Sequence, residues 1–169
     1  MRHSHEVGNS LRRLRPAILA SALLAFLATA QTGHCQGITK TADLGFGAMV
    51  PYSGGTVEIT PLGDRSATGG VLLVPGFSGS IHAATFTVSG PSNSTYSITL
   101  PEDGTVTLSD GANHSMALDT FTSSPTGSGT VSGASPGTQT LRVGATLHVG
   151  SPQAAGQYSG SYEIIIAFN

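Results

Sequence analysis

Residues 156–169 read GQYSGSYEIIIAFN and carry the most regular apolar pattern of the chain. The apolar and aromatic side chains fall on even-numbered positions, so in a strand, where successive side chains point to opposite faces, they share one face. These residues are Tyr158, Tyr162, Ile164, Ile166 and Phe168. The other face is polar at first and becomes apolar at Ile165 and Ala167. This pattern predicts a strand that is half exposed at its start and covered on both faces near its end.

The chain before this stretch consists of short alternating runs separated by turn residues, and after residue 30 no run has the period of a helix. Runs that recur about every ten residues are typical of a β-sandwich, so we expect an all-β fold with about nine or ten short strands. The first run, residues 38–47 (ITKTADLGFG), places Ile38, Leu44 and Phe46 on one face, which predicts that they form the core side of the first strand. In the run at residues 141–149, Gly144 can mark a β-bulge.

The first thirty residues have the pattern of a signal peptide rather than of a folded domain. Arg12 and Arg13 begin a basic region, residues 17–30 are an apolar run, and residues 28–30 (ATA) fit a signal peptidase site, which predicts cleavage before Gln31. The apolar run is shorter than the roughly 20 residues of a membrane-spanning helix. We therefore expect a signal peptide at residues 1–30, a short flexible segment at 31–37 and one domain at 38–169. Export by the Sec pathway, with no transmembrane segment in the mature chain, would place the protein in the periplasm, at the cell surface or outside the cell.

The charge of the mature chain argues against a nucleic-acid partner. From residue 31 onward there are three basic residues (Lys40, Arg65 and Arg142) against eight acidic ones, a net charge of −5, so no basic patch can neutralise phosphates. A single cysteine, Cys35, allows no internal disulfide. The domain must therefore be held together by its hydrophobic core.

The sequence offers no set of residues suited to catalysis. His82, His114 and His148 lie in separate segments without metal-ligand spacing, and the acidic pair Glu102–Asp103 belongs to a turn with an Asp-Gly step. No nucleophile, base and orienting residue can be named together. We predict that the protein is not an enzyme and uses neither a cofactor nor a metal.

Several segments carry a resemblance to known families: ITKTADLGFG, SGGTVEI, RSATGG, ATFTVSG, YSITLP and GQYSGSYEIIIAFN. Together they resemble the bacterial secreted family called domain of unknown function 4402, over residues 38–169. The LGFG run is similar to the opening of spore coat protein U-like domains, a group related to pilins. The last segment resembles the C-terminal recognition motif of chaperone-usher pilins, because Phe168 is penultimate and Gly156 is fourteenth from the end. It departs from that motif at Gly160, which is small, and in having Phe where Tyr is usual.

The pilin resemblance implies an incomplete immunoglobulin-like, pilin-like sandwich, whose hydrophobic groove is filled by a strand from a chaperone and then from the next subunit. The protein would then be a non-enzymatic structural or accessory subunit of a bacterial surface fibre or extracellular coat. Its partners would be a periplasmic chaperone and other copies or related subunits. The assembly residues would be those of the last strand, namely Gly156, Tyr158, Tyr162, Ile164, Ile166 and Phe168.

The source of a donor strand leaves alternatives open. Residues 31–37 (QTGHCQG) offer only Cys35, with Ile38 next to them, as an apolar side chain to donate. Either residues 38–46 serve as both first strand and donor, or the protein is a tip or accessory subunit, or the sandwich is complete. In the last case the alternative function is a secreted β-sandwich that binds a glycan or protein ligand without polymerising, with Tyr52 and Phe77 as its loop aromatics.

Overall fold

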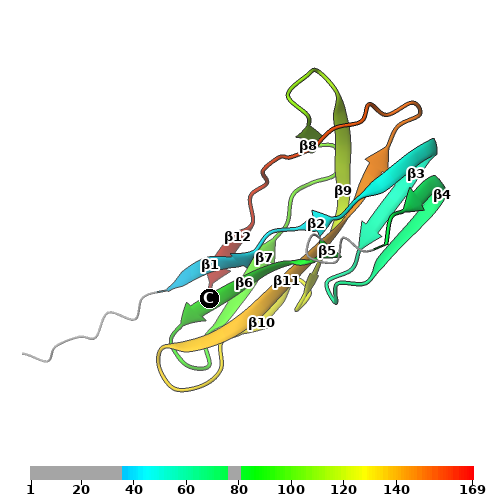
Figure 1. The fold of residues 1–169 in the computed structure, drawn as a ribbon. Helices are drawn as coiled ribbons and strands as arrows, with labels where there is room; N and C mark the ends of the chain where they lie inside the picture. Colours follow the sequence, from blue (N-terminus) through cyan, green and yellow to red (C-terminus); the bar gives the residue numbers. More distant parts are fainter. Residues whose placement is uncertain (1–35, 76–80) are drawn as a thin grey trace, which may run out of the picture. The chain divides into compact units, whose positions relative to one another are not determined.

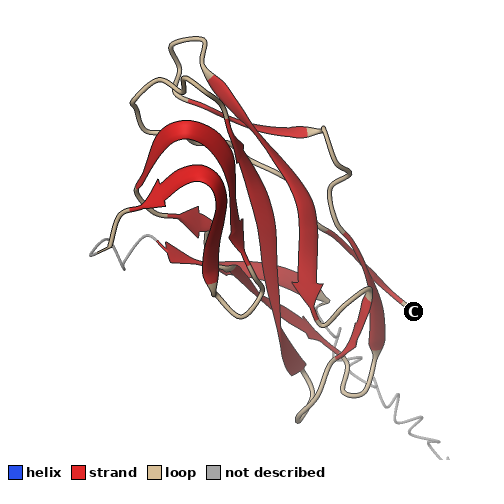
Figure 2. Ribbon diagram, turned by 90° about the vertical axis from the view of Figure 1, so that its right-hand side faces the viewer, coloured by secondary structure: helices blue, strands red, loops and turns tan. Residues whose placement is uncertain are grey.

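The computed structural model describes residues 36–75 and 81–169, and all regular structure in them is β-strand (Figures 1 and 2). The expected all-β fold is confirmed. The strands are β1 (Gly37–Ala42), β2 (Gly45–Phe46), β3 (Met49–Ile59), β4 (Arg65–Leu73), β5 (Ile81–His82), β6 (Ala84–Gly90), β7 (Thr95–Thr99), β8 (Val106–Ser109), β9 (Ser115–Ser124), β10 (Ser128–Thr130), β11 (Gly137–Val149) and β12 (Ile165–Phe168). These described strands outnumber the nine or ten expected, because the first run is divided into β1 and β2 and because β5 is too short to show an alternating pattern. No helix in this part of the chain could cross a membrane.

The largest sheet is built around β11, the longest strand. Its strand order is β1-β6-β11-β3-β4, in which β6 and β3 pair with the same edge of β11. The other edge of β11 pairs with β9, and β9 in turn pairs with β8. The first half of β11 pairs with β6 and its second half with β3. The alternation of the sequence explains this central position, because the odd-numbered side chains from Leu141 to Val149 are buried while Arg142 and His148 are exposed. The register with β9 shifts after Gly144, so the predicted bulge is confirmed.

A second sheet of three strands has the order β10-β7-β12. The last strand is antiparallel to β7, with Ile166 opposite Ile98 and Phe168 opposite Tyr96. A third, two-stranded sheet joins β2 to β5. The C-terminal strand therefore belongs to a different sheet from β1, although Figure 1 shows β12 ending beside β1.

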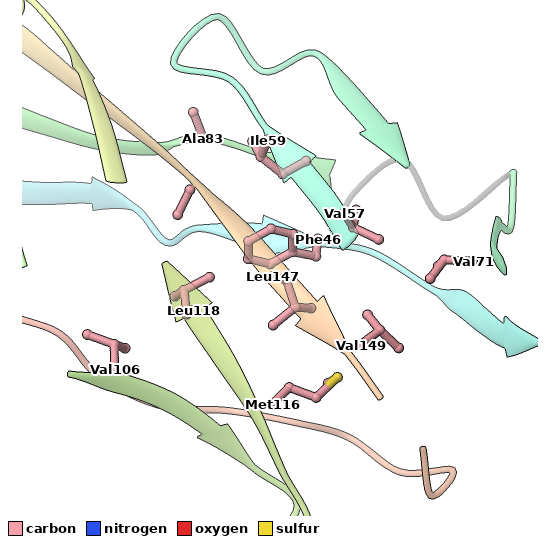
Figure 3. Close-up of a cluster of buried hydrophobic side chains, with 11 residues drawn as sticks. Phe46, Val57, Ile59, Val71, Ala83, Val106, Met116, Leu118, Leu147 and Val149 are labelled. Atoms are coloured by element: carbon pink, nitrogen blue, oxygen red, sulfur yellow. The ribbon is translucent and has the colours of Figure 1, made fainter. Parts of the chain in front are cut away.

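Two clusters of buried side chains form the core. The first surrounds Leu147, which lies in the register between Val57 of β3 and Leu118 of β9 (Figure 3). The second contains Val88, Tyr96, Leu141 and their neighbours, and the side chains of the C-terminal segment pack against it. The second cluster is thus the part of the core that the last strand helps to cover.

The C-terminal stretch differs from its sequence prediction in two ways. Only residues 165–168 form strand, while Ser159 makes an isolated bridge to Ser109 at the end of β8. The stretch therefore connects the β8 side of the fold to the β7 sheet. In addition, Ile165 is 54% exposed, so the expected cover on both faces is wrong. The outward neighbours of Ile165 and Ala167 on β7 are Thr99 and Ser97, small polar side chains typical of a solvated face.

Candidate functional site

A cleft of about 270 Å³ lies between the start of β1 and the end of β12. It is lined by Gln36, Gly37, Ile38, Ile166 and Phe168. Among the described residues, β1 pairs only with β6, and β12 pairs only with β7. The two walls of the cleft are therefore sheet edges, because no other strand of the described chain pairs with β1 or β12 on the cleft side.

The apolar side chains that face the cleft are only partly covered. From residue 161 to residue 169 every odd position is exposed and every even one is half-buried, although the even side chains pack against the second core cluster. On the opposite wall, Ile38 is 38% exposed, whereas Val88, its partner in β6, is fully buried. The sequence placed Ile38 in the core, and the structure leaves it exposed because nothing in the described chain covers β1 on the cleft side.

Phe168 is held at the base of the cleft by close packing. Its ring centroid lies 5.7 Å from that of Tyr96, at a tilt of 51°. A Cβ atom built at Gly90 would lie 2.7 Å from Cε1 of Phe168, so the ring occupies space that only glycine leaves open. The main-chain N–H of Asn169 also donates to the carbonyl of Thr95 (3.0 Å). These contacts fix the end of β12.

Polar groups lie further along the same two walls. Lys40 Nζ donates to Asp43 Oδ1 at 2.5 Å, and that hydrogen bond lowers the pKa of Asp43. On the other wall Tyr162 packs on Phe121, with ring centroids 5.0 Å apart. Burial, and to a lesser extent the negative charge of Asp43, raise the pKa of Tyr162 to about 12.

The order of residues along the two walls gives their relative direction. Ile38 and Phe168 line the same cleft, while the negative charge of Asp43, just after β1, helps to raise the pKa of Tyr162, just before β12. The two walls therefore run antiparallel to each other. A strand placed between them would be antiparallel to one wall and parallel to the other.

The structure divides the expected assembly residues into two groups. Tyr162, Ile164, Ile166 and Phe168 pack against the second core cluster, and Tyr162 also packs against the first. Tyr158 instead packs against the first cluster, where its hydroxyl accepts a hydrogen bond from Gln153 Nε2 (2.8 Å) and donates one to the carbonyl of Ala154 (2.9 Å).

The two glycines of the expected motif also differ. Gly156 is exposed, and a Cβ built there would be in ordinary contact with Asp110, whereas a Cβ built at Gly160 would lie 2.5 Å from the carbonyl oxygen of Thr107. The small residue at 160 is therefore required by the close passage of the chain over β8.

The expected residues of the first strand are spread along the chain as it enters the core. Phe46 is buried in β2, and Leu44, between β1 and β2, packs against both core clusters. Sequence reasoning did not identify Lys40 or Asp43 as part of this region. The available signal was parity, because Lys40 is two residues from Ile38 and so falls on the same face of a strand.

The family described as Domain of unknown function (DUF4402) matches residues 37–168. The chain belongs to this family. Neither the curated proteins nor the solved structures contain a match to this chain.

The three histidines in the described part of this DUF4402 chain each have a different partner. His114 contacts Asp110 (2.6 Å) and His148 contacts Asp119 (3.3 Å), while His82 Nδ1 lies 2.5 Å from the carbonyl oxygen of Asp43. In the described residues no three His, Cys, Asp or Glu side chains are grouped as metal ligands. Cys35, Phe77 and the expected signal peptide lie outside the described residues.

A second cleft, of about 350 Å³, lies between the turn after β3 and the β5–β6 region. It is lined by Leu62, Gly63, Ile81, His82, Ala83, Thr85 and Arg142. The loop aromatic expected at Tyr52 is 83% exposed, but it lies within β3 rather than in a loop. The register of β3 with β4 shifts between Pro51 and Gly54, which places Tyr52 in a bulged part of the strand.

Proposed function

We propose that this DUF4402 chain is a non-enzymatic structural or accessory subunit of a bacterial surface fibre or extracellular coat, assembled when a strand from another polypeptide fills the cleft between β1 and β12. The observation that carries the proposal is the pair of facing sheet edges with partly exposed Ile38, Ile166 and Phe168 between them. An added strand would supply main-chain hydrogen bonds to both edges, and its alternate side chains would cover the apolar ones.

The sequence supports the same conclusion independently. Residues 156–169 resemble the C-terminal recognition motif of pilins, which belongs to proteins with an incomplete immunoglobulin-like sandwich. The expected signal peptide fits export through the Sec pathway to the periplasm and the cell surface. The partners would then be a periplasmic chaperone and other copies or related subunits.

The test begins with the exported chain purified alone. Size-exclusion chromatography and thermal melting are recorded with and without a synthetic strand of alternating apolar residues. We expect the added strand to raise Tm and to suppress aggregation, because it covers the exposed edges. A chain that melts cooperatively as a monomer and gains no stability from any strand would contradict the proposal.

Two neighbouring isoleucines provide a matched pair of variants. Ile166 faces the cleft and Ile165 faces outward. Ile166→Asn should abolish the stabilisation by the added strand, whereas Ile165→Asn should retain it. Equal losses in both variants would show that the strand does not bind in this cleft.

A second candidate function is a self-complete secreted module that binds a glycan or protein ligand without polymerising. It is favoured by the second cleft, in which Arg142 and His82 lie beside the exposed side chain of Leu62. The same experiment separates the two candidates. A stable monomer indifferent to added strands, with ligand binding lost in Arg142→Ala, would favour the binding module.

A further inference from the structure

The strip between β1 and the C-terminal segment has two chemically different ends. One end is the apolar cleft around Ile38, Ile166 and Phe168. The other, which we call the polar end, is the Lys40–Asp43 ion pair. We propose that this arrangement selects the incoming strand by its side-chain pattern: an apolar residue seated in the cleft and, two positions away on the same face, an acidic residue that binds at the polar end.

The register places Lys40 on the side that an incoming strand would meet. Directly opposite residues in antiparallel strands share a face. Ile38 is opposite Val88 and Lys40 is opposite Phe86, and both partners belong to the second core cluster. Lys40 therefore follows Ile38 along the inner side of β1. A strand whose side chain fits beside Ile38 presents its next inward side chain, two residues on, to Lys40, whichever direction it runs.

The Lys40 ammonium at the polar end calls for an acceptor on the incoming strand. The ammonium group of Lys40 has three N–H donors, and Asp43 is its one side-chain partner among the described residues. A carboxylate on the incoming strand can accept from the Lys40 ammonium, whereas an ammonium or an alkyl group cannot.

The polar end also disfavours a strand that has apolar side chains at both inward positions. An alkyl side chain over Lys40 would remove the Lys40–Asp43 pair from water and offer no hydrogen bond in return, which is unfavourable for any buried charge. Glu163, the nearby acidic residue on the other wall, is exposed on the outward face and does not compete for this position. Lys40 is therefore the specificity-determining residue of the strip.

This inference rests on the proposed strand complementation, and its test is designed to fail separately from it. A strand is tethered to the exported chain by a flexible linker after Asn169, so that it returns along β12. Four versions of equal length are compared, with Ile–x–Glu, Ile–x–Lys, Ile–x–Leu or Ser–x–Glu at the two inward positions. Each is also made in Lys40→Glu and in the control Thr39→Glu, whose substitution lies on the opposite face of β1.

We expect the Ile–x–Glu version to melt about 3 °C above the Ile–x–Lys and Ile–x–Leu versions, the shift that one good charge contact gives in a domain of this size. Lys40→Glu should reverse the order of the Glu and Lys versions, and Thr39→Glu should not. If Ile–x–Leu melts highest, or if Lys40→Glu leaves the order unchanged, the selection by Lys40 is wrong while strand complementation stands. If no version melts above Ser–x–Glu, the cleft does not take a strand and both proposals are wrong.

Discussion

Phe168 and Gly90 are complementary in shape, because a Cβ atom at Gly90 would lie 2.7 Å from Cε1 of the Phe168 ring. The backbone of Gly90 is outside the left-handed region, so alanine there is resisted by the ring and not by the main chain. Gly90→Ala should therefore destabilise the protein by about 1 to 2 kcal/mol, the usual cost of overpacking, as measured by urea unfolding. In a Phe168→Leu background the same substitution should cost much less. Additive effects in the double variant would mean that the two residues do not compete for this space.

Gly160 and Gly156 test the path of the C-terminal segment over β8. A Cβ at Gly160 would lie 2.5 Å from the carbonyl oxygen of Thr107, a main-chain atom that cannot move without disturbing the strand. Gly160→Ala should lower the free energy of unfolding by about 2 kcal/mol, and it should expose the amides of the Ser109–Ser159 bridge to hydrogen exchange. Gly156→Ala, at an exposed position with room for a methyl group, is the matched control and should change stability by less than about 0.5 kcal/mol. Similar losses in both variants would contradict this path.

The alternation in residues 156–169 was enough to identify which side chains face inward, since Tyr162, Ile164, Ile166 and Phe168 are all half-buried on one side. It could not show which sheet the strand would join. The partner of β12 is β7, more than sixty residues earlier, and the outward exposure of Ile165 follows from that pairing. Local pattern specifies parity, whereas cover on the second face depends on distant pairing that the pattern does not encode.

The candidate site was predictable to a similar extent. The alternating, aromatic pattern of residues 156–169 predicts a strand with an apolar face, and the even-numbered side chains from Tyr162 to Phe168 do pack against the core. That Ile38 would remain exposed, and that Lys40 and Asp43 would lie on the facing wall, depended on β1 and the C-terminal segment approaching each other from different sheets. No local signal reports such an approach.

Ile38 and Val88 are directly opposite each other in the β1–β6 register, but Ile38 is 38% exposed whereas Val88 is fully buried. This difference in burial can be measured. Val88→Ala should destabilise the chain alone by about 2 kcal/mol, because it leaves a cavity in the second core cluster. Ile38→Ala should cost less than about 1 kcal/mol in the chain alone, since its side chain is partly solvated. With a tethered strand that stabilises the protein, the cost of Ile38→Ala should rise while that of Val88→Ala stays the same. An unchanged cost at Ile38 would show that the tethered strand does not cover it.

Tyr162 should make stability fall at high pH. Its folded pKa, raised to about 12 mainly by burial, lies above the value of about 10 for an unfolded tyrosine. Below pH 10 the side chain is protonated in both states, and its contribution is fully present. Between about pH 10 and pH 12 the unfolded state releases the proton first, so it binds fewer protons than the folded state and the free energy of unfolding decreases as pH rises.

Tyr162→Phe isolates this contribution, since phenylalanine keeps the ring packed on Phe121 but cannot ionise. Urea unfolding of both proteins at several pH values between 8 and about 11.5 should give a shallower decline for the variant. Some decline should persist, because burial also raises the pKa of Tyr96, whose hydroxyl donates to Gln139 Oε1 at 2.8 Å. Parallel curves for the two proteins would mean that Tyr162 is solvated in the folded state.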